Sequence, residues 1–124
     1  QIFESVKLYG TLSPLEVHKL FAISDISLLF SGFGESFPNV LAESMLYGTI
    51  PIATELGDAS YIVSNFGEIV SLDISAQQIS EIILNYANLK YYSPEIWMQK
   101  GNSCKDFSLN RFDIKNIASK FNDL

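Results

Sequence analysis

Short apolar runs alternate along this chain with segments that carry helix-start signals. Ser13, Pro14 and Glu16 form a capping box with proline at the first helical position, and Ser75 with Gln78 forms a second capping box. The continuous apolar run Ile26–Phe30 lies between them, is bounded by Ser31 and Gly32, and suits a strand buried on both faces. This alternation predicts an α/β layer with a parallel sheet and right-handed crossovers.

We expect a Rossmann-like parallel sheet of about four strands with helices on both faces, in a single domain over residues 1–124. The expected strands are Val6–Gly10, Ile26–Phe30, Thr49–Thr54 and Glu68–Val70. The expected helices are one from Pro14, Pro38–Tyr47, Ala59–Val63, one after Ser75, one from Pro94, and a last one that begins at Ser108 and buries Ile114, Ile117, Ala118 and Phe121.

Charge and cysteine content narrow the function classes. The net charge is −6, so a basic surface that follows nucleic-acid phosphates is not expected. Cys104 is the only cysteine, which excludes an internal disulfide and suggests a reducing compartment. The sequence shows neither a signal peptide nor a run of roughly 20 apolar residues. We therefore expect the protein to be located in the cytoplasm. For the full enzyme, the alternative is peripheral attachment to the inner face of the membrane.

Two glutamates flank the start of the predicted helix 38–47. Glu35 follows the turn-rich stretch 31–34, and Glu43 shares a helix face with Asn39, four residues before it. A glycine-containing loop that leads into a helix offers backbone N–H groups to an anion. The pattern is typical of a site for a phosphorylated sugar or a nucleotide. The alternative is two ordinary solvated carboxylates near a helix start, where the helix dipole favours them.

The block from Gly34 to Thr54 resembles the C-terminal domain of family 4 glycosyltransferases, which have the two-domain GT-B architecture and retain anomeric configuration. The shared features are the Glu-x7-Glu spacing of Glu35 and Glu43 and the segment Ala42–Thr54. Weaker similarities extend over most of the chain, at Val6–Gly10, Ala22–Asp25, Gly57 and Phe66–Val70. The resemblance implies a hexosyltransferase that moves a sugar from a nucleotide diphosphate sugar to a glycan or lipid-linked acceptor, as in bacterial polysaccharide assembly.

The resemblance also implies a role for each matching residue. Glu35 would be the catalytic residue at the donor sugar, and Glu43 would bind the ribose. Further donor contacts would come from Gly34, Ser36, Phe37, Pro38, Asn39 and Val40 at the helix start, and from Gly10, Thr11 and Leu12 beside the base. Ser36 stands where the family has a glycine. No metal and no cofactor besides the nucleotide sugar donor are expected.

Family members carry an arginine and a lysine for the diphosphate and a separate N-terminal acceptor domain, and this chain shows neither. We therefore expect it to be part of the nucleotide-sugar-binding domain and inert alone. Its expected partners are the nucleotide sugar, the missing acceptor domain and, through the face 114–121, a second copy.

Two other interpretations remain open from the residues. One is a non-catalytic flavodoxin-like or response-regulator-like binding module, which rests only on the α/β alternation. The other is a transferase that has lost catalysis and acts in binding. For His18 we expect a surface or packing role, because no metal ligand lies at helical spacing from it.

Overall fold

The computed structural model describes residues 5–30 and 39–112. Within these residues a parallel sheet has the order β1-β2-β3, with β1 at Ile26–Leu29, β2 at Ile50–Thr54 and β3 at Glu68–Val70. The helices are α1 (Pro14–Ile23), α2 (Asn39–Met45), α3 (Ala59–Val63), α4 (Ala76–Tyr92) and α5 (Pro94–Arg111). The Rossmann-like α/β class predicted from the sequence is confirmed, with three described strands instead of about four.

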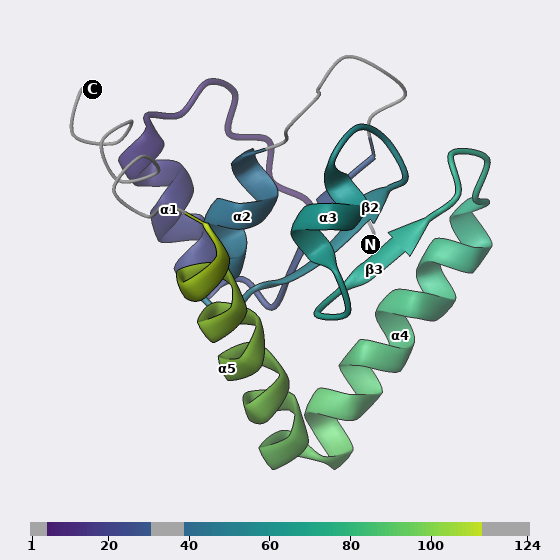
Figure 1. Cartoon of the computed structure of the whole chain (residues 1–124). Coiled ribbons are helices and arrows are strands. Elements are labelled where there is room, and N and C mark those ends of the chain that lie inside the picture. The colour runs from purple at the N-terminus through teal and green to yellow at the C-terminus, as the bar shows by residue number, and fades with distance from the viewer. Residues whose placement is uncertain (1–4, 31–38, 113–124) are drawn as a thin grey trace.

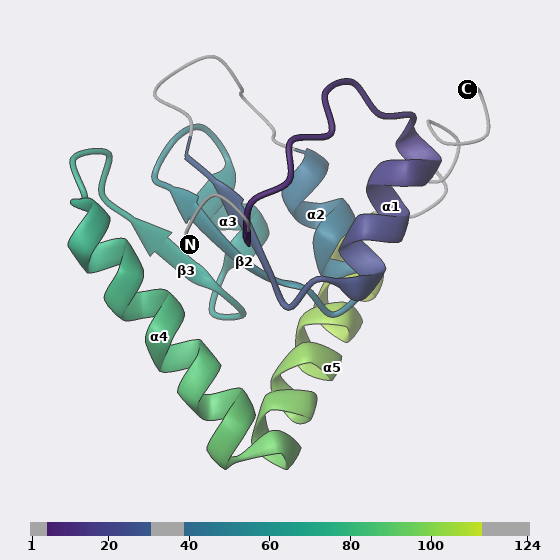
Figure 2. The same ribbon diagram turned by 180° about the vertical axis from the view of Figure 1, so that it is seen from behind.

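The central strand β2 forms the core of the domain. All five of its residues are buried, and β1 and β3 pair with it on either side. In Figure 1, α2 and α3 lie over β2, while α4 and α5 diverge as a V. Ser93 is the residue that separates these two helices in the chain. Figure 2 shows the same V from behind, with α1 on the side of α5. The helices therefore enclose β2 and leave β1 at an edge of the described sheet.

Local signals placed most helices correctly. Ser13 and Ser75 both form the expected capping boxes, in which each serine side chain accepts from the N3 backbone and the N3 side chain bonds back. Gly48 adopts a left-handed φ of 76°, which ends the turn after α2 as a glycine readily does. The bounds of α3 and β3 agree with the prediction.

The prediction of a strand at Val6–Gly10 is wrong. These residues form no strand, and Leu8 is 95% exposed. A strand requires a hydrogen-bonding neighbour. In the described part of the chain β1 pairs only with β2, and residues 6–10 are not paired with β1 or with any other strand. β1 itself is less buried than its sequence suggested, since Leu28 is 49% exposed.

The prediction that Ser108 begins a separate last helix is also wrong. Ser108 lies inside α5, is fully buried, and its Oγ donates to the carbonyl of Ala42 at 2.9 Å. A serine within a helix can satisfy its hydroxyl on a neighbouring helix instead of capping its own. The apolar face expected over 114–121 lies outside the described residues.

Candidate functional site

The first half of the predicted site, Gly34, Glu35, Ser36, Phe37 and Pro38, lies outside the described residues. The second half is carried by α2, which begins at Asn39, follows β1 in the chain and packs against β1 and β2. Ligands of parallel α/β sheets bind where strands end and the following helices begin. Asn39, Val40 and Glu43 therefore lie in the region of the fold where a ligand is expected.

Helix α2 is fixed on two sides by buried hydroxyl groups. Ser44 donates to the carbonyl of Leu41 at 2.9 Å, and its Oγ lies 3.0 Å from the Oγ of Ser27 on β1. Ser108 of α5 holds the carbonyl of Ala42 from another side. Buried polar groups of this kind are satisfied within the protein and constrain the helix position. Glu43 is consequently carried on a helix that has little freedom to shift.

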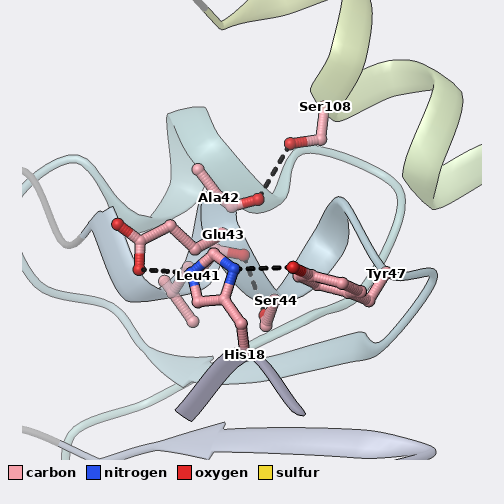
Figure 3. A network of polar contacts seen from close by, with 7 residues as sticks. All are labelled: His18, Leu41, Ala42, Glu43, Ser44, Tyr47 and Ser108. Carbon is pink, nitrogen blue, oxygen red and sulfur yellow. Dashed lines mark hydrogen bonds and ion pairs between the residues drawn. The ribbon is translucent and has the colours of Figure 1, made fainter. Parts of the chain in front are cut away.

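Glu43 faces His18 of α1 (Figure 3). Oε2 of Glu43 lies 3.6 Å from Nε2 of His18, and the two side chains are 17% and 8% exposed. Nδ1 of the same ring lies 2.7 Å from the hydroxyl of Tyr47, in the turn after α2. The imidazole thus lies between the carboxylate and the phenol, and we call His18, Glu43 and Tyr47 the α1–α2 triad.

Aromatic packing holds the imidazole in place. The ring centroid of His18 is 5.2 Å from that of Tyr47 in an edge-on arrangement and 5.6 Å from that of Phe21, one turn further along α1. Burial lowers the pKa of His18 below its usual value of 6.5, because the charged form loses hydration. The ring is therefore neutral at pH 7 and places no positive charge beside Glu43.

Sequence reasoning missed the α1–α2 triad. It assigned His18 a surface or packing role, and the structure confirms the packing. The contact of the buried ring with Glu43, a residue already predicted to bind a ligand, was not predicted. One signal was present: His18 and Phe21 are three residues apart, so they share the apolar face of α1. The partner on α2 follows 25 positions later and has no such local signal.

Lowering the pH is expected to destabilise the folded chain through His18. Unfolding restores its ordinary pKa near 6.5, so the unfolded state binds more protons as the pH falls. The contribution of His18 to the free energy of unfolding should therefore be constant above about pH 7 and decrease as the pH falls from 6.5 toward the lower native pKa. Urea unfolding from pH 7.5 to 5.5 measures this. A His18→Gln chain, which has no histidine, should lack the decrease in that interval, and an equal decrease in both chains would contradict the assignment.

The other predicted donor-binding residues lie around α2 or precede α1. Asn39 and Val40 are half-buried, and Val40 lines a cavity of about 240 Å³ between α1, β1 and α2. Gly10 has a left-handed φ of 66°, Thr11 is exposed and Leu12 is half-buried. These three lead into α1 and, among the contacts described, do not join the α1–α2 triad.

A larger cavity of about 530 Å³ lies elsewhere, between β1, α4 and α5. Its wall includes Trp97 and Tyr86, whose ring centroids are 5.9 Å apart, and the ion pair in which Nζ of Lys90 lies 2.9 Å from Asp25. Asp25 precedes β1, so this cavity adjoins the amino end of that strand. No residue of the α1–α2 triad lines this cavity, and Trp97 packs against the core from α5.

The surroundings of Cys104 bear on the reactivity of its thiol. Cys104 is buried, its Sγ lies 3.5 Å from the carbonyl of Thr49, and burial raises the pKa of the thiol to about 12. It is thus a packed thiol rather than a nucleophile.

Within residues 5–30 and 39–112 no group of three or more histidine, cysteine or acidic side chains is arranged to hold a metal. In the same part of the chain, every helix falls short of the length and hydropathy that crossing a membrane requires.

Comparisons with known proteins identify the family to which this chain is similar. The sequence model of the family described as "Glycosyl transferases group 1" matches residues 1–100. A curated protein of Klebsiella pneumoniae, named "Uncharacterized 41.2 kDa protein in cps region", is 26% identical over 120 residues. The match covers 95% of this chain and 31% of that protein. The chain therefore spans about a third of the length of the relative it matches.

Proposed function

This chain belongs to the family of group 1 glycosyl transferases, and we propose that it supplies the donor-binding part of a retaining enzyme that uses a nucleotide diphosphate sugar. The acceptor is a glycan or a lipid-linked glycan. The relative from a cps region supports a setting in polysaccharide assembly. Residues beyond this chain would complete the domain and supply the acceptor half, since the chain spans 31% of that relative.

The observation that carries the proposal is the placement of Glu43. Its carboxylate stands on α2 after β1, oriented by His18 on one side, while its second oxygen points away from that ring (Figure 3). An ionised carboxylate accepts hydrogen bonds and donates none, so it suits a ligand that presents hydroxyl groups. Two neighbouring hydroxyls, as on a ribose, match the two oxygens of one carboxylate.

The proposed reaction follows from these roles. The bond between the anomeric carbon and the diphosphate breaks, the diphosphate leaves with the electron pair, and an acceptor hydroxyl bonds to the anomeric carbon and passes its proton to the departing diphosphate. Glu43 holds the ribose and so fixes the nucleotide relative to the sheet. Glu35, eight residues earlier in the sequence, is proposed to contact the donor sugar, with Gly34 and Ser36–Val40 beside it. The base is proposed to lie near Gly10–Leu12.

Calorimetric titration of the 124-residue chain with UDP, GDP and ADP tests the proposal. We expect one of these to bind with a dissociation constant in the micromolar to millimolar range, and the corresponding nucleotide sugar to compete for the same site. We also expect no sugar transfer by this chain alone, in an assay with the nucleotide sugar and a glycan acceptor. A folded chain that binds none of the nucleotides would contradict the donor-binding role, and transfer by the chain alone would contradict its dependence on further residues.

A further inference from the structure

His18 is placed to control the orientation of Glu43. We propose that His18 is a positioning residue, which holds the Glu43 carboxylate through a neutral imidazole whose proton is kept on Nε2 by Tyr47. The part of this inference that concerns ligand binding rests on the proposed function. The arrangement itself is a property of the α1–α2 triad and can be measured without a ligand.

The triad joins two helices that are separate in sequence. His18 comes from α1, whereas Glu43 lies on α2 and Tyr47 follows it by one helical turn. Glu43 and Tyr47 are four residues apart, so both side chains reach toward the same ring. Nε2 meets the carboxylate at 3.6 Å and Nδ1 meets the phenol at 2.7 Å. Each ring nitrogen thus has a different kind of neighbour.

The two neighbours determine the tautomer. An ionised carboxylate has no proton to donate, so the nitrogen that faces Glu43 is favoured to carry the ring proton. In a neutral imidazole the other nitrogen, Nδ1, is then an acceptor, and the hydroxyl of Tyr47 donates to it. The result is a polar chain from the Tyr47 hydroxyl through His18 to Glu43. A ring held in this way directs an N–H dipole at the carboxylate and leaves the carboxylate charge in place.

Fixing the carboxylate matters because a glutamate side chain has several rotatable bonds. Ordering such a side chain at the moment of binding reduces affinity. A buried, 8% exposed imidazole that already occupies one side of Glu43 removes many of its rotamers before a ligand arrives. Neutrality is useful too, since an imidazolium would compete with the ligand hydroxyls for the carboxylate.

A role in packing alone makes different predictions from a positioning role. In that case any residue of similar volume at position 18 would preserve ligand affinity, and the tautomer would be immaterial. His18→Leu and His18→Gln separate the two roles, because both fill space but only glutamine can place an N–H group toward Glu43. Tyr86→Phe is the matched control, since Tyr86 is a buried residue of α4 whose hydroxyl donates to Glu68 and not to α2 or the triad.

The first experiment reads the tautomer by nitrogen-15 NMR of the imidazole. His18 is the sole histidine of the sequence, so its ring signals need no assignment. At pH 7.5 we expect the Nε2–H tautomer to predominate. Tyr47→Phe, which keeps the ring but removes the hydroxyl, should shift the Nδ1 signal toward that of an unbonded nitrogen. A predominant Nδ1–H tautomer, or ring signals unchanged by Tyr47→Phe, would overturn the proposal.

The second experiment measures nucleotide affinity with the nucleoside diphosphate that the unmodified chain binds. His18→Leu should weaken it by about two- to tenfold, the cost of ordering one rotamer-rich side chain. His18→Gln should recover most of that loss, and Tyr86→Phe should leave affinity unchanged even where it lowers the melting temperature. Equal affinity in the leucine and unmodified chains would overturn the proposal. If the unmodified chain binds no nucleotide, the donor-binding function fails, whereas the tautomer measurement still decides whether the triad is arranged as inferred.

Discussion

Glu43→Gln is expected to weaken binding of the nucleoside diphosphate by roughly ten- to a hundredfold. The substitution keeps the size of the side chain but replaces one acceptor oxygen with an N–H₂ group and removes the charge. Hydrogen bonds to a charged group contribute about 1.5–3 kcal/mol, which corresponds to that range of affinity. The N–H₂ group would also meet a ring nitrogen of His18 that already carries a proton, so the orientation of the side chain should change as well.

Calorimetric titration of the unmodified and Glu43→Gln chains measures this effect. Glu81→Gln, on the exposed side of α4, is the matched control for the change in net charge. Thermal unfolding should place both variants close to the unmodified chain, because Glu43 is partly exposed and contributes little to the core. Nucleotide affinity that is equal in the Glu43→Gln and unmodified chains would remove Glu43 from the binding site.

Gly67→Ala is expected to lower the free energy of unfolding by about 3 kcal/mol or more, the upper range for an oversized residue in a packed site. A Cβ at Gly67 would lie 2.2 Å from the carbonyl oxygen of Pro51 and under 3 Å from its ring atoms. Pro51 belongs to β2, which is buried throughout and paired on both sides, so its main chain cannot move aside. Since a small domain is stable by only about 5–15 kcal/mol, such a loss is severe.

Urea denaturation of the two chains tests this expectation. Gly10→Ala provides the comparison, because Gly10 has a left-handed φ but nothing within 4 Å of the position of an added Cβ. Its cost should be only the backbone term of about 1–2 kcal/mol. A Gly67→Ala chain that loses less than the Gly10→Ala chain would show that the β2–β3 contact adjusts more easily than its geometry indicates.

The sequence predicted those elements whose signals are local. Capping boxes at Ser13 and Ser75 placed α1 and α4, and Gly48 marked the end of the turn after α2, because each depends on residues within one helical turn. The predicted class of fold followed from the order of these elements. The family followed from the block around Glu43, and the match over residues 1–100 confirms it at the level of group 1 glycosyl transferases.

Local signals failed where a partner distant in sequence was needed. Val6–Gly10 has the composition of a strand but no strand beside it among the described residues. Ser108 is a residue type that often caps helices, yet α5 continues through it. Its hydroxyl donates a hydrogen bond to the carbonyl of Ala42 instead of capping a new helix. The role of Glu35 and its loop stays a prediction, since those residues lie outside the described part of the chain.

The candidate site shows the same division. By itself, the sequence determined that two glutamates lie on either side of the start of a helix after the second apolar run, because motif spacing is a property of the chain. Only the tertiary structure decided that the ring of His18 on α1 lies between Glu43 of α2 and Tyr47 of the following turn. That contact depends on how α1 packs against α2. The packing is set by many apolar contacts of both helices and not by any residue near His18 in the sequence.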